Sequence, residues 1–398
     1  MSSSSSDEVD EALDEIVDEV VDNYIDSMVN AQTNKPKRRS YIERERELGH
    51  KQLWKDYFAE NPTYQPEMFR RRFRMNKTLF LRIVQSLSTE LPYFQQRRNA
   101  HGRLGLSALQ KFTAAIRMMA YGQSGDMYDK YLRLGESTSR LCLDNFTNGI
   151  LQLFGAEYLR RPTPADLQRL LDVGEARGFP GMVGSIDCMH WEWKNCPTAW
   201  RGQFTRGSGK PTIVLEAVAS QDLWIWHAFF GLPGRAPKVN NHTYHMAYYL
   251  TDGIYPHWAT FIQSIPLPQG PKAVRFAERQ EATRKDVERA FGVLQSRFAI
   301  VKNPALQWDK EKIGRIMRCC VILHNMIVEN ERDGYNQIDT SEFESGESSR
   351  SSQVRRRESL NVHNMLGIRT EVRNSDKHDR LKADLIENIW QMFGNVDD

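Results

Sequence analysis

The sequence predicts a mixed α/β protein in which a helical N-terminal region precedes a layered core of strands and helices. Residues 64–180 carry apolar side chains at helical intervals. From residue 181 onward, short runs rich in β-branched and aromatic residues, bounded by Gly, Pro or Ser, predict strands. Two long helical patterns follow, at about 272–300 and 309–332. Strands followed by helices are typical of an α/β or α+β core.

Charge separates the first residues from the rest of the chain. Residues 1–34 contain ten Asp and Glu and no Lys or Arg, so the remainder carries 54 basic and 41 acidic side chains. The basic body favours a nucleic-acid partner, although an ordinary solvated surface explains the same balance. The arm itself has apolar residues at helical spacing: Val9, Leu13, Ile16, Val20 and Tyr24. It is either a helix that docks on a partner or a disordered acidic tail.

Two further segments have the composition of linkers. Residues 35–63 form a basic, charged linker, and its run "KPKRRSYIERERE" (35–47) is typical of nuclear import. Residues 334–360 are polar and Ser-rich, and residues 361–398 end in a predicted helix. Because the run at 35–47 is typical of nuclear import, we expect localisation in the nucleus.

Composition also argues against several classes of protein. No run of 18 or more apolar residues is present, so we expect neither a membrane span nor a secretory signal. Five cysteines in 398 residues do not make a disulfide framework, which indicates a reducing compartment. The stretch "RGSGKPT" lacks the spacing of a Walker phosphate loop, so a nucleoside triphosphatase is not expected.

The helical region 64–180 contains a possible DNA-binding motif. The helix "LSALQKFTAAIRMMAYG" is predicted to end at Gly122. Farther on, a Gly-Glu-Ser turn precedes a long helix, with Ser137 or Thr138 as its expected N-cap. A helix, a turn with Gly and a second helix fit a helix-turn-helix motif and a helical bundle equally well.

Acidic residues at three places in the α/β region raise a chemical question. Asp187 lies within the predicted strand "GSIDCMHWEW", where an ionised carboxylate costs several kcal/mol unless it is compensated. Asp252 ends the predicted strand "AYYLTDGIYP" (247–256), and Glu288 lies in a helix at the margin of its buried stripe. Carboxylates from separate elements can converge on one or two Mg²⁺ ions, which would compensate Asp187. The spacing of these residues alone does not establish such a site.

Other candidate ligands have simpler explanations. Neither the set Cys188, His190 and Cys196 nor the pair His242 and His245 supplies four ligands at zinc-finger spacing, so structural zinc is not expected. Cys319 and Cys320 lie in an apolar helical run and are expected to be small buried hydrophobes.

Basic residues flank Glu288 on its predicted helix. Arg284, Lys285 and Arg289 either contact phosphate or solvate a helix face. Phosphate contact is favoured because the predicted cleft is adjacent.

Several of these stretches together resemble a known family. "GSIDCMHWEWKNCPTAWRGQF", "PTIVLEAVAS", "LTDGIYPHWATFI", "RKDVERAFGVLQSRFAI" and "VILHNMIVENER" occur in this order. They resemble the Harbinger-type (PIF/Harbinger) transposases and the nucleases derived from them, particularly the plant transposon-protein branch. The resemblance runs over about residues 60–335.

This resemblance implies a helical DNA-binding region that is followed in the sequence by a ribonuclease-H-like catalytic domain at 181–333. It also implies an Asp-Asp-Glu triad of Asp187, Asp252 and Glu288 that holds Mg²⁺, with Mn²⁺ as a substitute, and cuts DNA. Family members tend to work with a second, Myb-like DNA-binding protein, and the acidic arm is a candidate docking element. A transposase-derived nuclear factor that binds DNA or protein without cutting is the alternative.

The sequence departs from the family pattern at one place. Relatives carry an additional segment, of the Gly-Ser-x-Asn-Asp-x-Asn-Val-Leu kind, where this chain runs from Gly234 directly into Arg235. The missing segment would cover one end of the sheet near the cleft. Because residues around a metal site fix its ligands, we expect a folded core with weak or absent nuclease activity.

Overall fold

Helices make up the first part of the chain in the computed structural model, which describes residues 44–100, 102–205, 209–231, 247–332 and 375–394. Residues 45–398 cluster as one unit, apart from residues 1–44. The predicted acidic arm, the Ser-rich linker and the junction at Gly234 lie outside the described residues. The helices before the sheet are α2 Arg46–Tyr57, α3 Pro66–Phe73, α4 Lys77–Glu90, α5 Ala108–Tyr121, α6 Asp129–Leu132, α7 Glu136–Tyr158 and α8 Pro164–Ala176.

Local sequence explains where these helices begin and end. Ser107 and Gln110 form a reciprocal capping box at the start of α5. Gly122 ends the same helix with a φ of 60°, a left-handed conformation that glycine adopts at little cost, so the predicted helix end is confirmed. Helix α7 starts at Glu136 with Gly135 as its N-cap residue, earlier than the predicted cap at Ser137 or Thr138.

The packing of α7 bears on the two alternatives for the turn before it. The helix packs against α5 and against α11, Lys310–Arg332. It buries Cys142, Phe146 and Ile150, and its exposed residues include Glu136 and Glu157 as well as Arg140. A recognition helix needs a free basic face for a DNA groove. The structure therefore favours bundle packing for this helix.

A five-stranded mixed sheet follows, so the predicted α/β class is confirmed. Its strand order is β3-β2-β1-β4-β5, in which β1 is antiparallel to β2, β2 is antiparallel to β3, and β1, β4 and β5 are parallel. The strands are β1 Met182–Glu192, β2 Thr212–Ala219, β3 Ile225–Gly231, β4 Tyr248–Thr251 and β5 Phe261–Gln263. The short helix α9, Thr198–Phe204, lies between β1 and β2. The predicted strand at 247–256 is shorter than expected, because the chain turns after Thr251.

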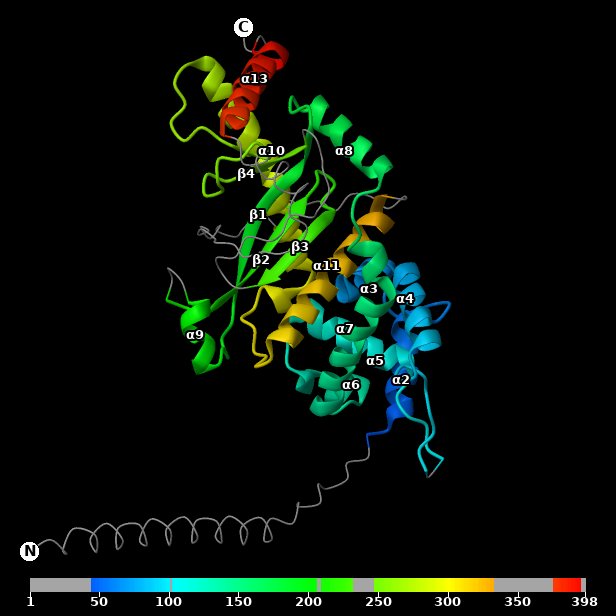
Figure 1. Ribbon diagram of the computed structural model, residues 1–398. Coiled ribbons are helices and arrows are strands. Elements are labelled where there is room, and N and C mark those ends of the chain that lie inside the picture. Colours follow the sequence, from blue (N-terminus) through cyan, green and yellow to red (C-terminus); the bar gives the residue numbers. More distant parts are fainter. Residues whose placement is uncertain (1–43, 101, 206–208, 232–246, 333–374, 395–398) are drawn as a thin grey trace, which may run out of the picture. The chain divides into compact units, whose positions relative to one another are not determined.

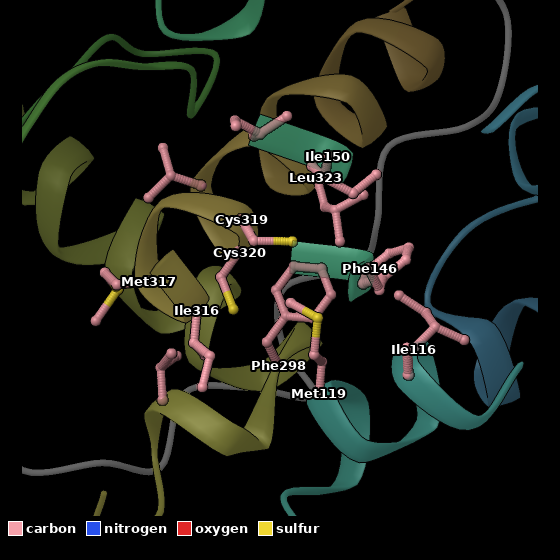
Figure 2. Packing of buried hydrophobic residues seen from close by; sticks show 14 of the residues in the cluster. Ile116, Met119, Phe146, Ile150, Phe298, Ile316, Met317, Cys319, Cys320 and Leu323 are labelled. Atoms are coloured by element: carbon pink, nitrogen blue, oxygen red, sulfur yellow. The ribbon is translucent and has the colours of Figure 1, made fainter. Parts of the chain in front are cut away.

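Helices after the sheet complete a large hydrophobic cluster. Helix α10, Pro271–Arg297, contacts β1 and β2, and α11 contacts β3 and α7. One cluster joins buried residues of the N-terminal helices, of β1 to β3, of the C-terminal half of α10 and of α11. Figure 2 shows part of it, where Cys319 and Cys320 of α11 lie among Phe146, Phe298 and Met119. Both thiols are free and buried, as the sequence predicts.

A second, smaller hydrophobic cluster includes residues of β4 and β5. The C-terminal helix α13, Ser375–Phe393, packs against α10 and β5 (Figure 1). The buried members of this cluster are Phe179, Met182, Tyr248, Leu250, Ile262, Phe276, Leu385 and Ile389. Among the described residues, none of the helices is both long and apolar enough to span a membrane.

Candidate functional site

Asp187 lies on β1 and points toward α10. The residues two positions before and after it contact this helix: the Ser185 hydroxyl donates to the Thr283 carbonyl at 3.3 Å, and Gln295 lies 2.8 Å from the sulfur of Met189. Because alternate residues of a strand share a face, Asp187 faces α10 between these two contacts. Its side chain is 15% exposed.

Asp252 comes to the same face from the neighbouring strand. Strands β1 and β4 run parallel, with Ser185 opposite Leu250. Asp252 directly follows the last residue of β4, and it is close enough to Asp187 for its charge to raise the pKa of Asp187. Gln280 of α10 fixes the end of β4, because its amide donates to the carbonyls of Thr251 at 3.1 Å and Ile262 at 3.0 Å.

Glu288 approaches from α10, with an arginine between it and Asp187. The Arg284 Nη1 atom lies 2.8 Å from Glu288 Oε1 and 3.6 Å from Asp187 Oδ2. The two carboxylate oxygens are therefore no farther apart than the sum of these distances. Glu288 is one turn after Arg284 on the helix, and its side chain is 33% exposed.

The titration of Asp187 reflects this crowded, buried environment. Burial raises the pKa of Asp187 to about 6, and the negative charges of Glu288 and Asp252 add to the rise. The Cys188 N–H bond to Asp187 Oδ1, at 2.7 Å, and the Arg284 guanidinium oppose it. Both other predicted carboxylates thus act electrostatically on Asp187, and in the structure Arg284 is the cation that compensates it.

A further acid, which the sequence analysis did not single out, lies on the other face of the sheet. Glu216 of β2 is opposite Cys188 in the strand register and is 5% exposed. Its Oε2 atom lies 3.9 Å from Cys188 Sγ, which is 3.4 Å from the hydroxyl of Tyr255. Burial raises the pKa of Glu216 to about 8 and also raises the pKa of Tyr255. An acid inside the apolar run "PTIVLEAVAS" is the same signal that drew attention to Asp187.

Two of the basic residues beside Glu288, Arg284 and Arg289, pair with acidic side chains. Arg284 is 14% exposed, and its other contact is Nη2 to Glu281 at 3.2 Å. Arg289 is exposed and pairs with the buried Asp286, which also pairs with Arg177 at the C-terminal end of α8. Lys285 is exposed on the same helix. Asp187, Asp252 and Glu288 are called the acidic group below. The expected role of Arg284 as a phosphate contact competes with its position inside this group.

The candidate zinc residues point to different partners. His190 Nδ1 lies 3.1 Å from the Thr212 hydroxyl, and the buried Cys196 thiol is 3.7 Å from the Pro197 carbonyl. His242 and His245 are outside the described residues. His324 of α11 belongs to neither of these sets. It is buried and bonds to the Leu223 carbonyl at 2.7 Å, and burial lowers its pKa to about 3.

The arginines of α3 are only partly available to a ligand. Arg70 pairs with Glu331 of α11 at 2.6 Å, and the Arg74 guanidinium lies 5.1 Å from the centre of the Tyr121 ring. Arg71 is exposed, and Arg72 is partly exposed. This helix therefore offers one exposed arginine, Arg71, and Arg70 also joins it to α11.

The donor set of the acidic group has the chemistry that Mg²⁺ prefers, because carboxylate oxygens are hard ligands. In the arrangement described, however, no three Asp, Glu, His or Cys side chains among the described residues are placed to hold a metal ion. Arg284 stands between two of the three carboxylates. A divalent ion and a guanidinium cannot share the same oxygen positions, so the ligands fit Mg²⁺ in type while Arg284 occupies the place between two of them.

Two family models match parts of the chain. A model described as "Plant transposon protein" matches residues 156–240 and 236–335, two ranges that meet at 236–240. A domain of unknown function matches residues 49–88.

Curated relatives match over a longer range. Proteins named "Putative nuclease HARBI1" from Homo sapiens and Bos taurus are 22% identical over 279 residues, which cover 66% of this chain and 78% of theirs. The protein of the same name from Rattus norvegicus is 21% identical over 279 residues. No solved structure matches the chain significantly. The resemblance predicted from the motifs is confirmed.

Proposed function

Because the chain belongs to the Harbinger-type, transposase-derived family, we propose that it is a divalent-metal-dependent DNA nuclease with Asp187, Asp252 and Glu288 as metal ligands. The observation that carries this proposal is the approach of three carboxylates, two from parallel neighbouring strands and one from α10, to one side of the sheet. The mixed five-stranded sheet supports the expected ribonuclease-H-like domain.

Each residue has a defined task in this proposal. Asp187 supplies a ligand from a site that largely excludes water, where its charge interacts strongly with a cation. Asp252 and Glu288 supply ligands from separate elements, so the position of the ion depends on how β4 and α10 are held. Bound Mg²⁺ or Mn²⁺ would activate a water molecule and stabilise the leaving oxygen of a phosphodiester. The basic N-terminal region, including Arg71, is proposed to bind DNA.

The alternative function is a nuclear factor that binds DNA or a protein without cutting. Two observations favour it: Arg284 lies within the acidic group, and the two matched ranges meet at 236–240, beside the junction where a family segment is expected to be missing. A Myb-like partner and nuclear localisation belong to both alternatives and are supported by family membership alone.

A cleavage assay with the full chain separates these functions. Duplex DNA that carries the terminal repeats of the related transposon is incubated with Mg²⁺ or Mn²⁺, and nicking is measured on a denaturing gel. We expect weak, metal-dependent cleavage that Asp187→Ala and Glu288→Gln reduce at least about 100-fold, because each removes a ligand.

Glu278→Gln is the matched control, because Glu278 is an exposed acid on the same helix. Cleavage that survives Asp187→Ala would refute the assigned triad. DNA binding by a folded wild-type chain without cleavage in either metal would support the binding factor instead. Restoring a family-like segment after Gly234 should then raise cleavage.

A further inference from the structure

Arg284 is enclosed by acidic side chains from two elements. Its Nη1 atom contacts Asp187 of β1 and Glu288 of α10, and its Nη2 atom contacts Glu281 one turn earlier on α10. A single nitrogen of the guanidinium therefore bridges two of the three proposed metal ligands. The nearby positive side chains, Lys285 and Arg289, are exposed and do not enter this group.

The electrostatic balance favours a permanent positive charge at this position. Glu288 at 2.8 Å, Glu281 at 3.2 Å and Asp187 at 3.6 Å surround the guanidinium, and an arginine side chain stays protonated in proteins. Without that charge, Asp187, Asp252 and Glu288 would repel one another in a partly buried place. Arg284 thus performs one task of a bound cation, since it compensates the charges of Asp187 and Glu288 and keeps these two side chains together.

The position is nevertheless poorly satisfied for an arginine. Its Nε atom is buried and has no hydrogen-bond acceptor among the described residues. Its contact with Asp187, at 3.6 Å, is longer than a normal charged hydrogen bond. Glu281 offers a second anchor on the same face of α10, one turn toward the N-terminus from Arg284, so the guanidinium can leave the two ligands and keep one ion pair.

We propose that Arg284 is an internal counter-ion that holds Asp187 and Glu288 together in the metal-free protein and is exchanged for the divalent cation. This inference rests on the proposed function, because it takes Asp187 and Glu288 to be metal ligands. When the cation binds, Arg284 turns toward Glu281. The affinity for metal is then set by competition between two cations for the same oxygens, and the fraction of molecules with Arg284 displaced limits it.

Direct metal binding by the full chain tests this competition without reference to cleavage. Mn²⁺ is titrated by calorimetry, and free Mn²⁺ is followed by its electron paramagnetic resonance signal. We expect Arg284→Gln to bind Mn²⁺ about 10-fold more tightly than the wild type, because the competing charge is gone. Arg284→Lys should lie between the two, and the metal-free Arg284→Gln chain should melt at a lower temperature.

Lys285→Gln is the matched control, because it removes the same charge from the next residue of α10, outside the acidic group. We expect it to change Mn²⁺ affinity by less than about 2-fold, as exposed charges are screened. Affinity in Arg284→Gln that equals or falls below that of the wild type would overturn the inference.

Asp187→Asn separates this inference from the proposed function. If Asp187→Asn abolishes Mn²⁺ binding while Arg284→Gln leaves it unchanged, the triad stands and the counter-ion role fails. If the wild type, Asp187→Asn and Arg284→Gln all bind Mn²⁺ alike, or none binds, the proposed metal site fails and the inference fails with it.

Discussion

The two hydrophobic clusters differ in how the chain builds them, and the candidate site lies where they meet. The large cluster draws on most helices and on three strands, so each of its members has many neighbours. The small cluster has eight buried members and depends on α13. Helix α10 belongs to both, with Phe276 in the small cluster and Val287 in the large one.

The three carboxylates are therefore held in place by different clusters. Asp187 and Glu288 are flanked by Met189, Val287 and Phe291, which belong to the large cluster. Asp252 follows β4, whose Tyr248 and Leu250 belong to the small one. The family model ends at residue 335, so α13 lies beyond the part that it matches. The position of Asp252 therefore depends on a helix outside the matched domain.

The largest expected effect is a loss of stability from a cavity in the large cluster. Phe146→Ala removes a fully buried ring from α7, where Phe112 packs against it with ring centres 5.0 Å apart. We expect the free energy of unfolding to fall by about 4 kcal/mol, because a cavity adds to the lost transfer energy. Urea unfolding followed by circular dichroism measures it. Leu141→Ala, at an exposed position of the same helix, is the control, and a similar loss in both variants would contradict the assignment.

A smaller and more local effect is expected from the small cluster. Ile389→Ala removes a fully buried side chain from α13. We expect a loss of about 3 kcal/mol, concentrated in amide hydrogen exchange at β4 and β5, while α11 keeps its protection. Met392→Ala, at an exposed position of α13, serves as the control. Equal loss of protection in α11 would mean that the two clusters unfold as one.

The smallest effect concerns Glu216, a buried acid that belongs to neither hydrophobic cluster. Its pKa of about 8 in the folded chain exceeds the ordinary value of 4.5, so the folded chain keeps a proton that the unfolded chain loses. Stability is therefore full at low pH and declines as the pH rises toward 8. From pH 6 to 8 we expect Glu216→Gln to reduce this decline by about 2 kcal/mol.

Denaturation of the wild type and Glu216→Gln at both pH values measures the difference. The raised pKa of Asp187, about 6, gives a decline of the same sign that ends at lower pH, and both proteins share it. If the free energy of unfolding falls by the same amount with pH in both proteins, Glu216 does not have a raised pKa in the folded chain.

The sequence predicted the helices and strands well because their signals are local. Apolar periodicity and the stop at Gly122 marked α5, and the strand around Asp187 extends over Met182–Glu192 as the apolar run indicates. The importance of Glu216 was missed because its partner Cys188 is 28 residues away, and only the register of β1 and β2 brings them together. The spacing of Arg284 and Glu288 was visible on the helix, but the contact with Asp187 depends on how α10 lies across β1.

Helix α10 also has a mechanical consequence for the site. It is one uninterrupted helix of 27 residues that is anchored in the large cluster near Glu288, so it behaves as a lever whose fulcrum lies beside that residue. Phe276, against which α13 packs, is about 18 Å farther along the arm at 1.5 Å per residue. A tilt of this arm barely moves Glu288. It displaces Gln280, and with it the Thr251 carbonyl and the adjoining Asp252, more than it displaces Glu288.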